Sequence, residues 1–179
     1  ARTVVANFAL DEEVLTIVSE HGTATRPAGV YTNLYGTTLT NSVTGVETVG
    51  GTQYVSTGWT LTGGVDTNGQ ATGTGTSVTL TQTNDTTLTW GWTTNYLLTS
   101  SSAGGGSVGG SSNGFYAAGT SMTVTATADT GYHFAGWTGD VPAADTNDAS
   151  VLLTMDQART VVANFALDEE VLTIVSEHG

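Results

Sequence analysis

The chain has 179 residues, of which 16 are Asp or Glu and three are Lys or Arg, for a formal net charge of −13. With so few cations to displace counterions from phosphates, the composition excludes nucleic acid as a partner. No cysteine is present, which excludes disulfides and thiolate metal sites, and no apolar run approaches the roughly 20 residues that span a bilayer. We therefore expect neither nucleic-acid binding nor membrane insertion.

The composition and the residue pattern both favour an all-β fold. The chain is rich in Thr, Val, Tyr and Trp, which suit pleated surfaces, and its 24 glycines supply turns. Asn84 and Asp85 are predicted to form the closing turn of the paired strands over residues 76–83 and 86–92. Period-two alternation predicts strands in the first half of the chain over residues 14–19, 37–43, 53–59, 76–83 and 86–92.

The same alternation predicts four strands later in the chain, over residues 121–128, 131–137, 149–155 and 159–165. Residues 155–159 are expected to form the hairpin that joins the last two. The glycine-rich residues 104–114 have the composition of a flexible linker. Their counterpart in the first half lies inside a folded module, so we expect a hairpin tip instead.

The two ends of the chain are identical. Residues 1–22 read ARTVVANFALDEEVLTIVSEHG, and residues 158–179 repeat them letter for letter after a period of 157 residues. Identity over this length indicates a tandem array, in which one structural unit is copied along the chain. The sequence therefore reads as one period plus an overlap, taken from a longer repeated protein.

A weaker repeat lies inside the period. The Gly-Trp pair that ends at Trp59 matches the pair that ends at Trp137, and residues 78–92 match residues 151–165. We therefore predict two related modules per 157-residue period, each a small β domain or small sandwich. The predicted parts are the last strand of a preceding module (1–9), a first module (10–96), a second module (97–166), and a linker with the first strand of the next module (167–179).

The second module resembles the divergent InlB B-repeat family of bacterial surface proteins. The similarity rests on Gly119-Thr, on MTVTATADTGYHFAGWTGD from Met122 to Asp140, and on LLTMDQARTVVANF from Leu152 to Phe165. The resemblance implies a small, β-grasp-like module used in strings on secreted or wall-attached proteins. Such modules are mostly spacers or interaction surfaces. The first module keeps the Gly-Trp pair and the paired final strands, as a more distant relative.

The large apolar side chains are candidates for the structural core. Trp59 and Trp137 are expected to anchor one module each, because one Trp buries a large area. Trp90 and Trp92 share one strand face and are expected to pack against a core or another module. If this strand face were exposed to solvent, Trp90 and Trp92 would instead form an aromatic strip that could contact a glycan. The full predicted core set is Trp59, Trp137, Phe165, Trp92 and Leu153.

Carboxylates gather in two places. One group lies at the repeat junction, which we define by Phe8, Asp11, Glu12 and Glu13 and by their copies Phe165, Asp168, Glu169 and Glu170. The other comprises Asp140, Asp145 and Asp148. Calcium binds such oxygen ligands, but the spacing is not that of a calcium loop. We expect no cofactor, with calcium at the second group as the alternative.

The sequence offers no catalytic arrangement. His21, its copy His178 and His133 provide one histidine per module, too few for a catalytic metal site of three ligands. No serine stands on a strand-turn-helix elbow. We therefore expect that the protein is not an enzyme.

These patterns predict a structural repeat unit of a long extracellular bacterial protein that forms a stalk, surface fibre or filament. A surface of Thr, Ser, Asn and Gly, with only 11% of residues charged, is typical of extracellular or cell-surface proteins. The expected partners are neighbouring copies of the same repeat, in the same chain or in adjacent subunits. The alternative function is an adhesive or glycan-binding module.

Overall fold

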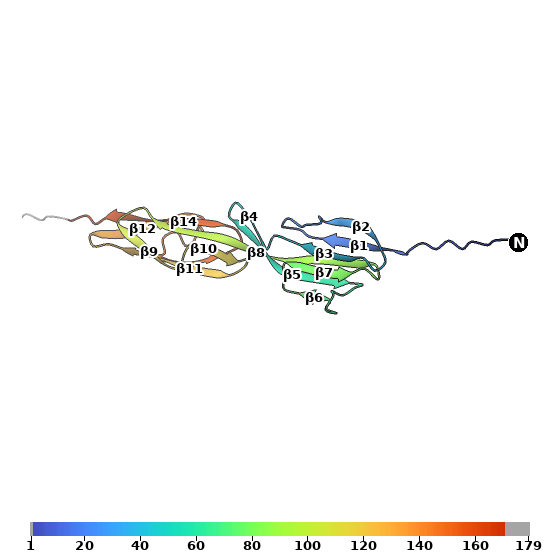
Figure 1. The fold of residues 1–179 in the computed structure, drawn as a ribbon. Helices are drawn as coiled ribbons and strands as arrows, with labels where there is room; N and C mark the ends of the chain where they lie inside the picture. The colour runs from blue at the N-terminus through green and yellow to red at the C-terminus, as the bar shows by residue number, and fades with distance from the viewer. Residues whose placement is uncertain (1, 171–179) are drawn as a thin grey trace, which may run out of the picture. The chain divides into compact units, whose positions relative to one another are not determined.

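A computed structural model describes residues 2–170, and Figure 1 shows its strands. The chain divides into two compact units, which we call unit 1 (Ala1–Thr94) and unit 2 (Asn95–Gly179). Every regular element among the described residues is a β-strand, which confirms the all-β prediction. The described part of the chain contains no helix long and apolar enough to cross a membrane.

Unit 1 consists of two sheets. The larger has the strand order β2-β1-β8-β5, with β4 and β6 paired to β5, and the smaller pairs β3 with β7. The strands of unit 1 are β1 (Glu12–Val18), β2 (Gly29–Leu34), β3 (Thr38–Ser42), β4 (Val46–Val49), β5 (Thr52–Thr62), β6 (Thr72–Gly73) and β7 (Ser77–Thr81). Unit 1 also contains the first part of β8, a long strand that runs over Thr86–Ser102.

Unit 2 also consists of two sheets. One has the order β10-β8-β14-β12, and the other has the order β13-β11-β9. Its elements are the second part of β8, β9 (Gly106–Gly110), β10 (Gly114–Ala117), β11 (Ser121–Ala128), β12 (Tyr132–Gly139), β13 (Ser150–Thr154) and β14 (Arg159–Leu167).

The two units share their strand pairing, residue by residue. In unit 1, β1 lies antiparallel to β2 and parallel to β8, and in unit 2 the second part of β8 lies antiparallel to β10 and parallel to β14. Leu39 pairs with Leu80 across β3 and β7, and the aligned residues Met122 and Leu153 pair across β11 and β13. β8 therefore supplies the last strand of unit 1 and the first strand of unit 2.

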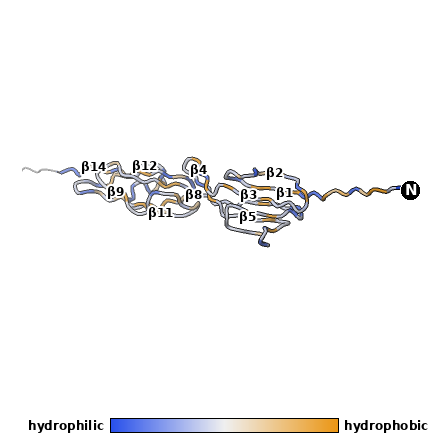
Figure 2. Tube along the Cα trace, viewed as in Figure 1, coloured by the Kyte–Doolittle hydropathy of each residue, from blue (hydrophilic) through white to orange (hydrophobic). Residues whose placement is uncertain are grey.

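Each unit buries its own core between its two sheets, as in a small sandwich. In unit 2, β8 and β14 contribute Leu98, Val161 and Ala163 from one sheet, while Val124 and Leu153 come from the other. The core of unit 1 is built the same way around Leu15, Ile17, Leu80, Leu88 and Trp90. Figure 2 shows hydrophilic and apolar stretches within both units, and the burial of single residues alternates along strands such as β13.

Three predicted connections are wrong. Residues 155–159 do not form a hairpin, because β13 pairs with β11 whereas β14 pairs with β12 and β8. The turn at Asn84 and Asp85 likewise joins strands of different sheets. In both cases the two consecutive strands belong to the two sheets that enclose one core, and each strand packs its apolar side chains into that core from its own sheet. The two strands therefore face each other across the core and are not hydrogen-bonded neighbours.

The third of these connections is the glycine-rich stretch 104–114, which contains a strand, β9, in place of the predicted hairpin tip. β9 pairs with β11, and Val108 packs against the unit 2 core. Glycine is required at Gly106 because a Cβ there would meet the ring of Phe165. The glycines of residues 104–114, which suggest a flexible linker, therefore allow β9 to pack closely against the rest of unit 2.

The Gly-Trp pairs have a common geometric basis. Gly58 has a backbone φ of +118° and Gly136 has a backbone φ of +130°. Residues other than glycine rarely adopt such values. The β12–β14 register shifts between Phe134 and Gly136, which marks a β-bulge. The bulge re-aims the chain so that the next side chain, Trp137, is buried.

We expect Gly136→Ala to destabilise unit 2 by about 1–3 kcal/mol, because it forces a positive φ on a residue with a side chain. The new Cβ would also lie 3.2 Å from the carbonyl oxygen of Thr146. Chemical denaturation monitored by NMR signals of unit 2 measures the loss. Gly109→Ala is the matched control, because its Cβ meets nothing within 4 Å. An equal effect from both substitutions would show that the positive φ of Gly136 is not the cause.

Candidate functional site

The repeated segment occurs in two different structural states. Residues 2–10 belong to no strand and lie outside the sheets, beyond β1 (Figure 1). Val4 is 92% exposed and Phe8 is 94% exposed. Their copies Val161 and Phe165 lie in β14, where Val161 is fully buried and Phe165 packs against the core. One sequence is thus a core strand at one place and an unpaired apolar segment at the other.

β14 is held by strands on both sides. It pairs antiparallel with β12, from Tyr132–Leu167 to Gly139–Val161, and parallel with β8, from Leu98–Arg159 onward. The Phe165 ring lies 5.9 Å from Phe134, edge to face. A strand with two neighbours satisfies its backbone groups on both edges, which makes β14 central to this sheet.

Polar side chains fix the start of β14. Arg159 donates three hydrogen bonds: Nε to the Thr154 carbonyl (2.7 Å), Nη1 to the Asp140 carbonyl (2.7 Å) and Nη2 to Asp156 Oδ1 (2.7 Å). The Thr160 amide donates to Asp140 Oδ2 (2.8 Å). For this Arg159–Asp140 clasp, the sequence names Asp140 as a candidate for calcium, but Arg159 is not among the predicted site residues. Its signal is the scarcity of arginine: the copies Arg2 and Arg159 are two of only three cations.

The acidic residues of the repeat junction extend the flanking strands. Asp168 Oδ1 lies 2.9 Å from His133 Nδ1, and the Asp168 amide donates to the Gly131 carbonyl. Glu12 and Glu13 are the first residues of β1, and the carbonyl of Asp11 accepts from the Tyr35 amide. Their copies Glu169 and Glu170 are exposed. The predicted first strand of a next module, which is the copy of residues 14–19, lies outside the described residues.

The tryptophans lie in the cores. Trp137 is 4% exposed and donates through Nε1 to the Asp148 carbonyl (2.8 Å), while Trp59 is 8% exposed. Trp90 is 3% exposed and donates to Asn41 Oδ1 (3.0 Å). Because the Trp90 ring is covered, Trp90 and Trp92 do not form an exposed strip of two rings for a glycan.

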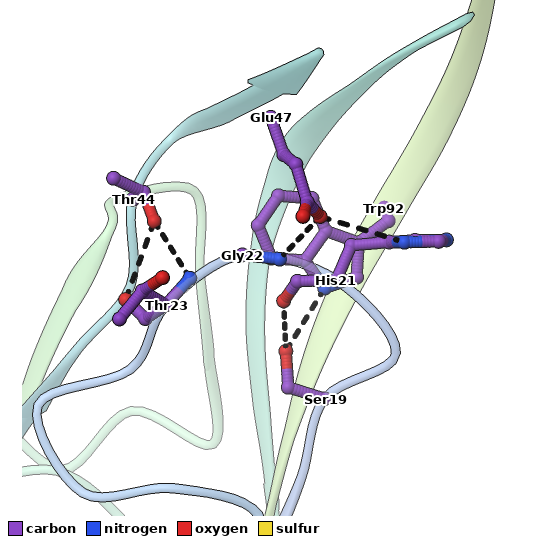
Figure 3. Close-up of polar contacts among 7 residues, drawn as sticks. All are labelled: Ser19, His21, Gly22, Thr23, Thr44, Glu47 and Trp92. Atoms are coloured by element: carbon purple, nitrogen blue, oxygen red, sulfur yellow. Dashed lines mark hydrogen bonds and ion pairs between the residues drawn. The ribbon is translucent and has the colours of Figure 1, made fainter. Parts of the chain in front are cut away.

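Trp92 takes part in a cluster of polar and aromatic groups at the end of β1 (Figure 3). Its Nε1 donates to Ser19 Oγ (3.1 Å), and the His21 ring lies edge-on to the indole at 6.0 Å. His21 stacks on Tyr54 at 3.5 Å and lies 3.7 Å from Glu47 Oε2, which also accepts from the Gly22 amide. These bonds tie the chain after β1 to β4 and β5 inside unit 1.

A shallow depression of about 460 Å³ lies beside Trp59 in unit 1. Its lining includes Trp59 and four threonines, Thr57, Thr60, Thr72 and Thr74. Trp59 is only 8% exposed, so little of its ring is available for a sugar ring to stack on.

The second acidic group has structural contacts. Asp140 accepts the Thr160 amide, and the carbonyl of Asp148 accepts the Trp137 indole. The Asp148 amide donates to the Asp145 carbonyl within the same loop. Across residues 2–170, no group of three or more His, Asp or Glu side chains is placed to hold a metal ion.

Comparison with known proteins identifies one family. The family described as the divergent InlB B-repeat domain matches residues 96–169, which include the second part of β8 and the whole of β9 to β14. Neither a search of curated proteins nor a search of solved structures found a match. The matched range covers unit 2, and β14 lies inside it.

Proposed function

Because residues 96–169 match the divergent InlB B-repeat domain, a repeat module typical of bacterial cell-surface proteins, we propose that this chain is a structural repeat unit of a long extracellular protein. That protein forms a stalk, surface fibre or filament. The observation that carries the proposal is the second β14 sequence at residues 2–10, which stands directly before β1. A module end followed at once by a module start is the arrangement of a tandem array.

The proposed role is mechanical, and we propose no catalysed reaction. The polar side chains that could carry chemistry make structural contacts: Arg159 clasps the β12–β13 loop, and His21 stacks on Tyr54. The partners we propose are neighbouring copies of the repeat, met at the repeat junction.

The charge of the chain suits a repeated extracellular protein. Each copy carries many carboxylates and few cations, so copies that are not joined repel one another at low ionic strength. This repulsion keeps an array soluble and limits contacts between arrays. Separate copies can then associate only through a specific contact that is strong enough to offset this electrostatic repulsion.

The test is the size of proteins that contain one, two and three periods. We expect the maximum dimension, from small-angle X-ray scattering or negative-stain images, to increase by the same increment with each added period at constant width. Particles that grow in all directions as periods are added would contradict a stalk or fibre. A maximum dimension that stays constant as periods are added would also contradict a stalk or fibre.

A further inference from the structure

The first and the last described strand of each unit are parallel neighbours in one sheet. In unit 1 these strands are β1 and the first part of β8, which pair over residues 15–18 of β1. In unit 2 they are the second part of β8 and β14, which pair over residues 159–163 of β14. One ladder of backbone hydrogen bonds therefore connects the strand by which the chain enters a unit with the strand by which it leaves.

Tension along the chain pulls these paired strands past each other. In an array, each unit is pulled at the start of its first strand and at the end of its last strand. Because the two strands are parallel, these two points lie at opposite ends of the shared ladder, and the pull acts along the strands. The evenly spaced hydrogen bonds of a parallel pair then carry the load together. A pull at the same end of both strands would instead break the bonds one after another.

The strands that would have to slide, β1 and β14, are central strands of their sheets. β1 lies between β8 and β2, and β14 lies between β8 and β12. A sliding strand must therefore break the ladders on both of its sides. It must also pull buried side chains out of a core, Leu15 and Ile17 from unit 1 or Val161 and Ala163 from unit 2. The loss of this burial opposes the sliding as well.

Polar side chains anchor β1 and β14 at the end opposite to the pull. At the start of β14, Arg159 donates to the carbonyls of Thr154 and Asp140. Just beyond the end of β1, Ser19 Oγ accepts from the indole of Trp92 on β8 (Figure 3). Each strand is thus bonded, at its unpulled end, to a part of the unit that does not move with it. These bonds must break before the strand can slide.

We infer that the β1–β8 pair of unit 1 and the β8–β14 pair of unit 2 are tension-bearing clamps, by which each unit resists unfolding under a pull along the array. This inference rests on the proposed function, since a stalk or fibre that is held at one end supplies the pull. β8 belongs to both clamps as one uninterrupted strand, Thr86–Ser102. Tension therefore passes from one clamp to the next along backbone that is already extended.

The experiment compares two directions of pull on unit 2 within the full chain. The chain has no cysteine, so two introduced cysteines fix the points where DNA handles for optical tweezers attach. The Thr93→Cys/Glu169→Cys protein is pulled before the second part of β8 and beyond the end of β14, which shears the clamp. The Thr93→Cys/Gln157→Cys protein is the matched control. It is pulled at the start of both strands, so the ladder opens from one end.

The substituted positions suit this comparison. Thr93, Gln157 and Glu169 are all exposed, and the two proteins differ only in which end of β14 is pulled. Each protein without handles should keep the denaturant midpoint of the unsubstituted chain. The length released on unfolding, about 3.3–3.6 Å for each residue between the two cysteines, shows that the event belongs to unit 2.

We expect the mean unfolding force of the sheared protein to be at least about twofold above that of the control at the same loading rate, because forced unfolding follows the barrier to unfolding. Unit 1 provides an independent measurement. There the Ala9→Cys/Thr93→Cys protein shears β1 against β8, and the Glu20→Cys/Thr93→Cys protein opens the pair from its far end. Ala9 and Glu20 are exposed, and the same ratio of forces is expected.

A ratio below about twofold in either unit would overturn the inference, because the parallel ladder would then not carry the load as a clamp. Arrays whose units unfold at low force can still grow by equal increments as periods are added. Units that resist force can equally belong to a protein whose maximum dimension does not grow. Failure of this inference is therefore seen separately from failure of the proposed function.

Discussion

The Trp137→Ala protein is expected to lose about 3–5 kcal/mol from the unfolding free energy of unit 2, the cost of truncating a buried Trp. The side chain is almost fully buried, and its ring lies 5.5 Å from Phe134. The substitution also removes the donor to the Asp148 carbonyl, which holds the loop between β12 and β13. Unit 1 has its own core and should keep its stability.

Amide hydrogen exchange followed separately in β11 and in β3 measures the two units. Trp137→Phe is the control, because it keeps an aromatic ring and removes the indole donor, and should cost about 1–2 kcal/mol. Fluorescence alone is insufficient, since the remaining Trp residues all lie in unit 1. A loss below about 1 kcal/mol, or an equal loss in both units, would argue against Trp137 as the anchor of unit 2.

The second large effect is expected at Gln82, which is fully buried in unit 1. Its Nε2 donates to the carbonyls of Val14 (3.1 Å) and Asn84 (2.7 Å). Gln82→Glu replaces this donor by a carboxylate that faces two carbonyl oxygens without a cation. We expect a loss of about 3–5 kcal/mol in the unfolding free energy of unit 1 at pH 7, as for an uncompensated buried charge.

This loss should depend on pH. Burial and the facing carbonyls favour the neutral acid, so the pKa of the new carboxyl group is raised in the folded protein above its usual value of about 4.3. Below that value both states hold the proton and the loss is smallest. As the pH rises, the unfolded chain releases the proton first and stability falls. Denaturant titrations at pH 4 and pH 7 measure the difference, and a pH-independent loss would show that the buried charge is not its cause.

The chain itself supplies the control for this experiment. Met155 is the counterpart of Gln82 in unit 2 and is also fully buried. Its amide donates to the Thr120 carbonyl and its carbonyl accepts from the Gly119 amide, just as Gln82 bonds to Thr37 and Gly36. Gln82→Met should therefore cost less than about 2 kcal/mol at either pH. The same backbone position thus accepts an apolar side chain but not a charge.

The positions of many strands follow from the sequence alone. Alternation of apolar and polar residues predicts β11 at residues 121–128, where the structure has it, and it finds β14 to within two residues. The reason is that each sheet buries one face, so burial alternates along the strand. The alignment of Leu80 with Leu153 also places both in equivalent strand pairs.

Strands that lack this alternation, and the choice of strand partners, are not predicted. β9 has glycines where a pattern would need side chains, and β2 is absent from the predicted strands. The hairpin expected at residues 155–159 fails because proximity in sequence does not select a neighbour when two sheets share a core. The Arg159–Asp140 clasp depends on a loop return that only the tertiary structure shows.

The repeated segment separates the two kinds of information most clearly. The sequence determined by itself that the chain is repetitive, that strands dominate, and that the second half is InlB B-repeat-like. It did not decide the state of RTVVANFAL, which is a buried strand at β14 and an exposed, unpaired segment at residues 2–10. A strand satisfies its backbone only through other strands, so its state depends on whether β8 and β12 lie on both sides of it.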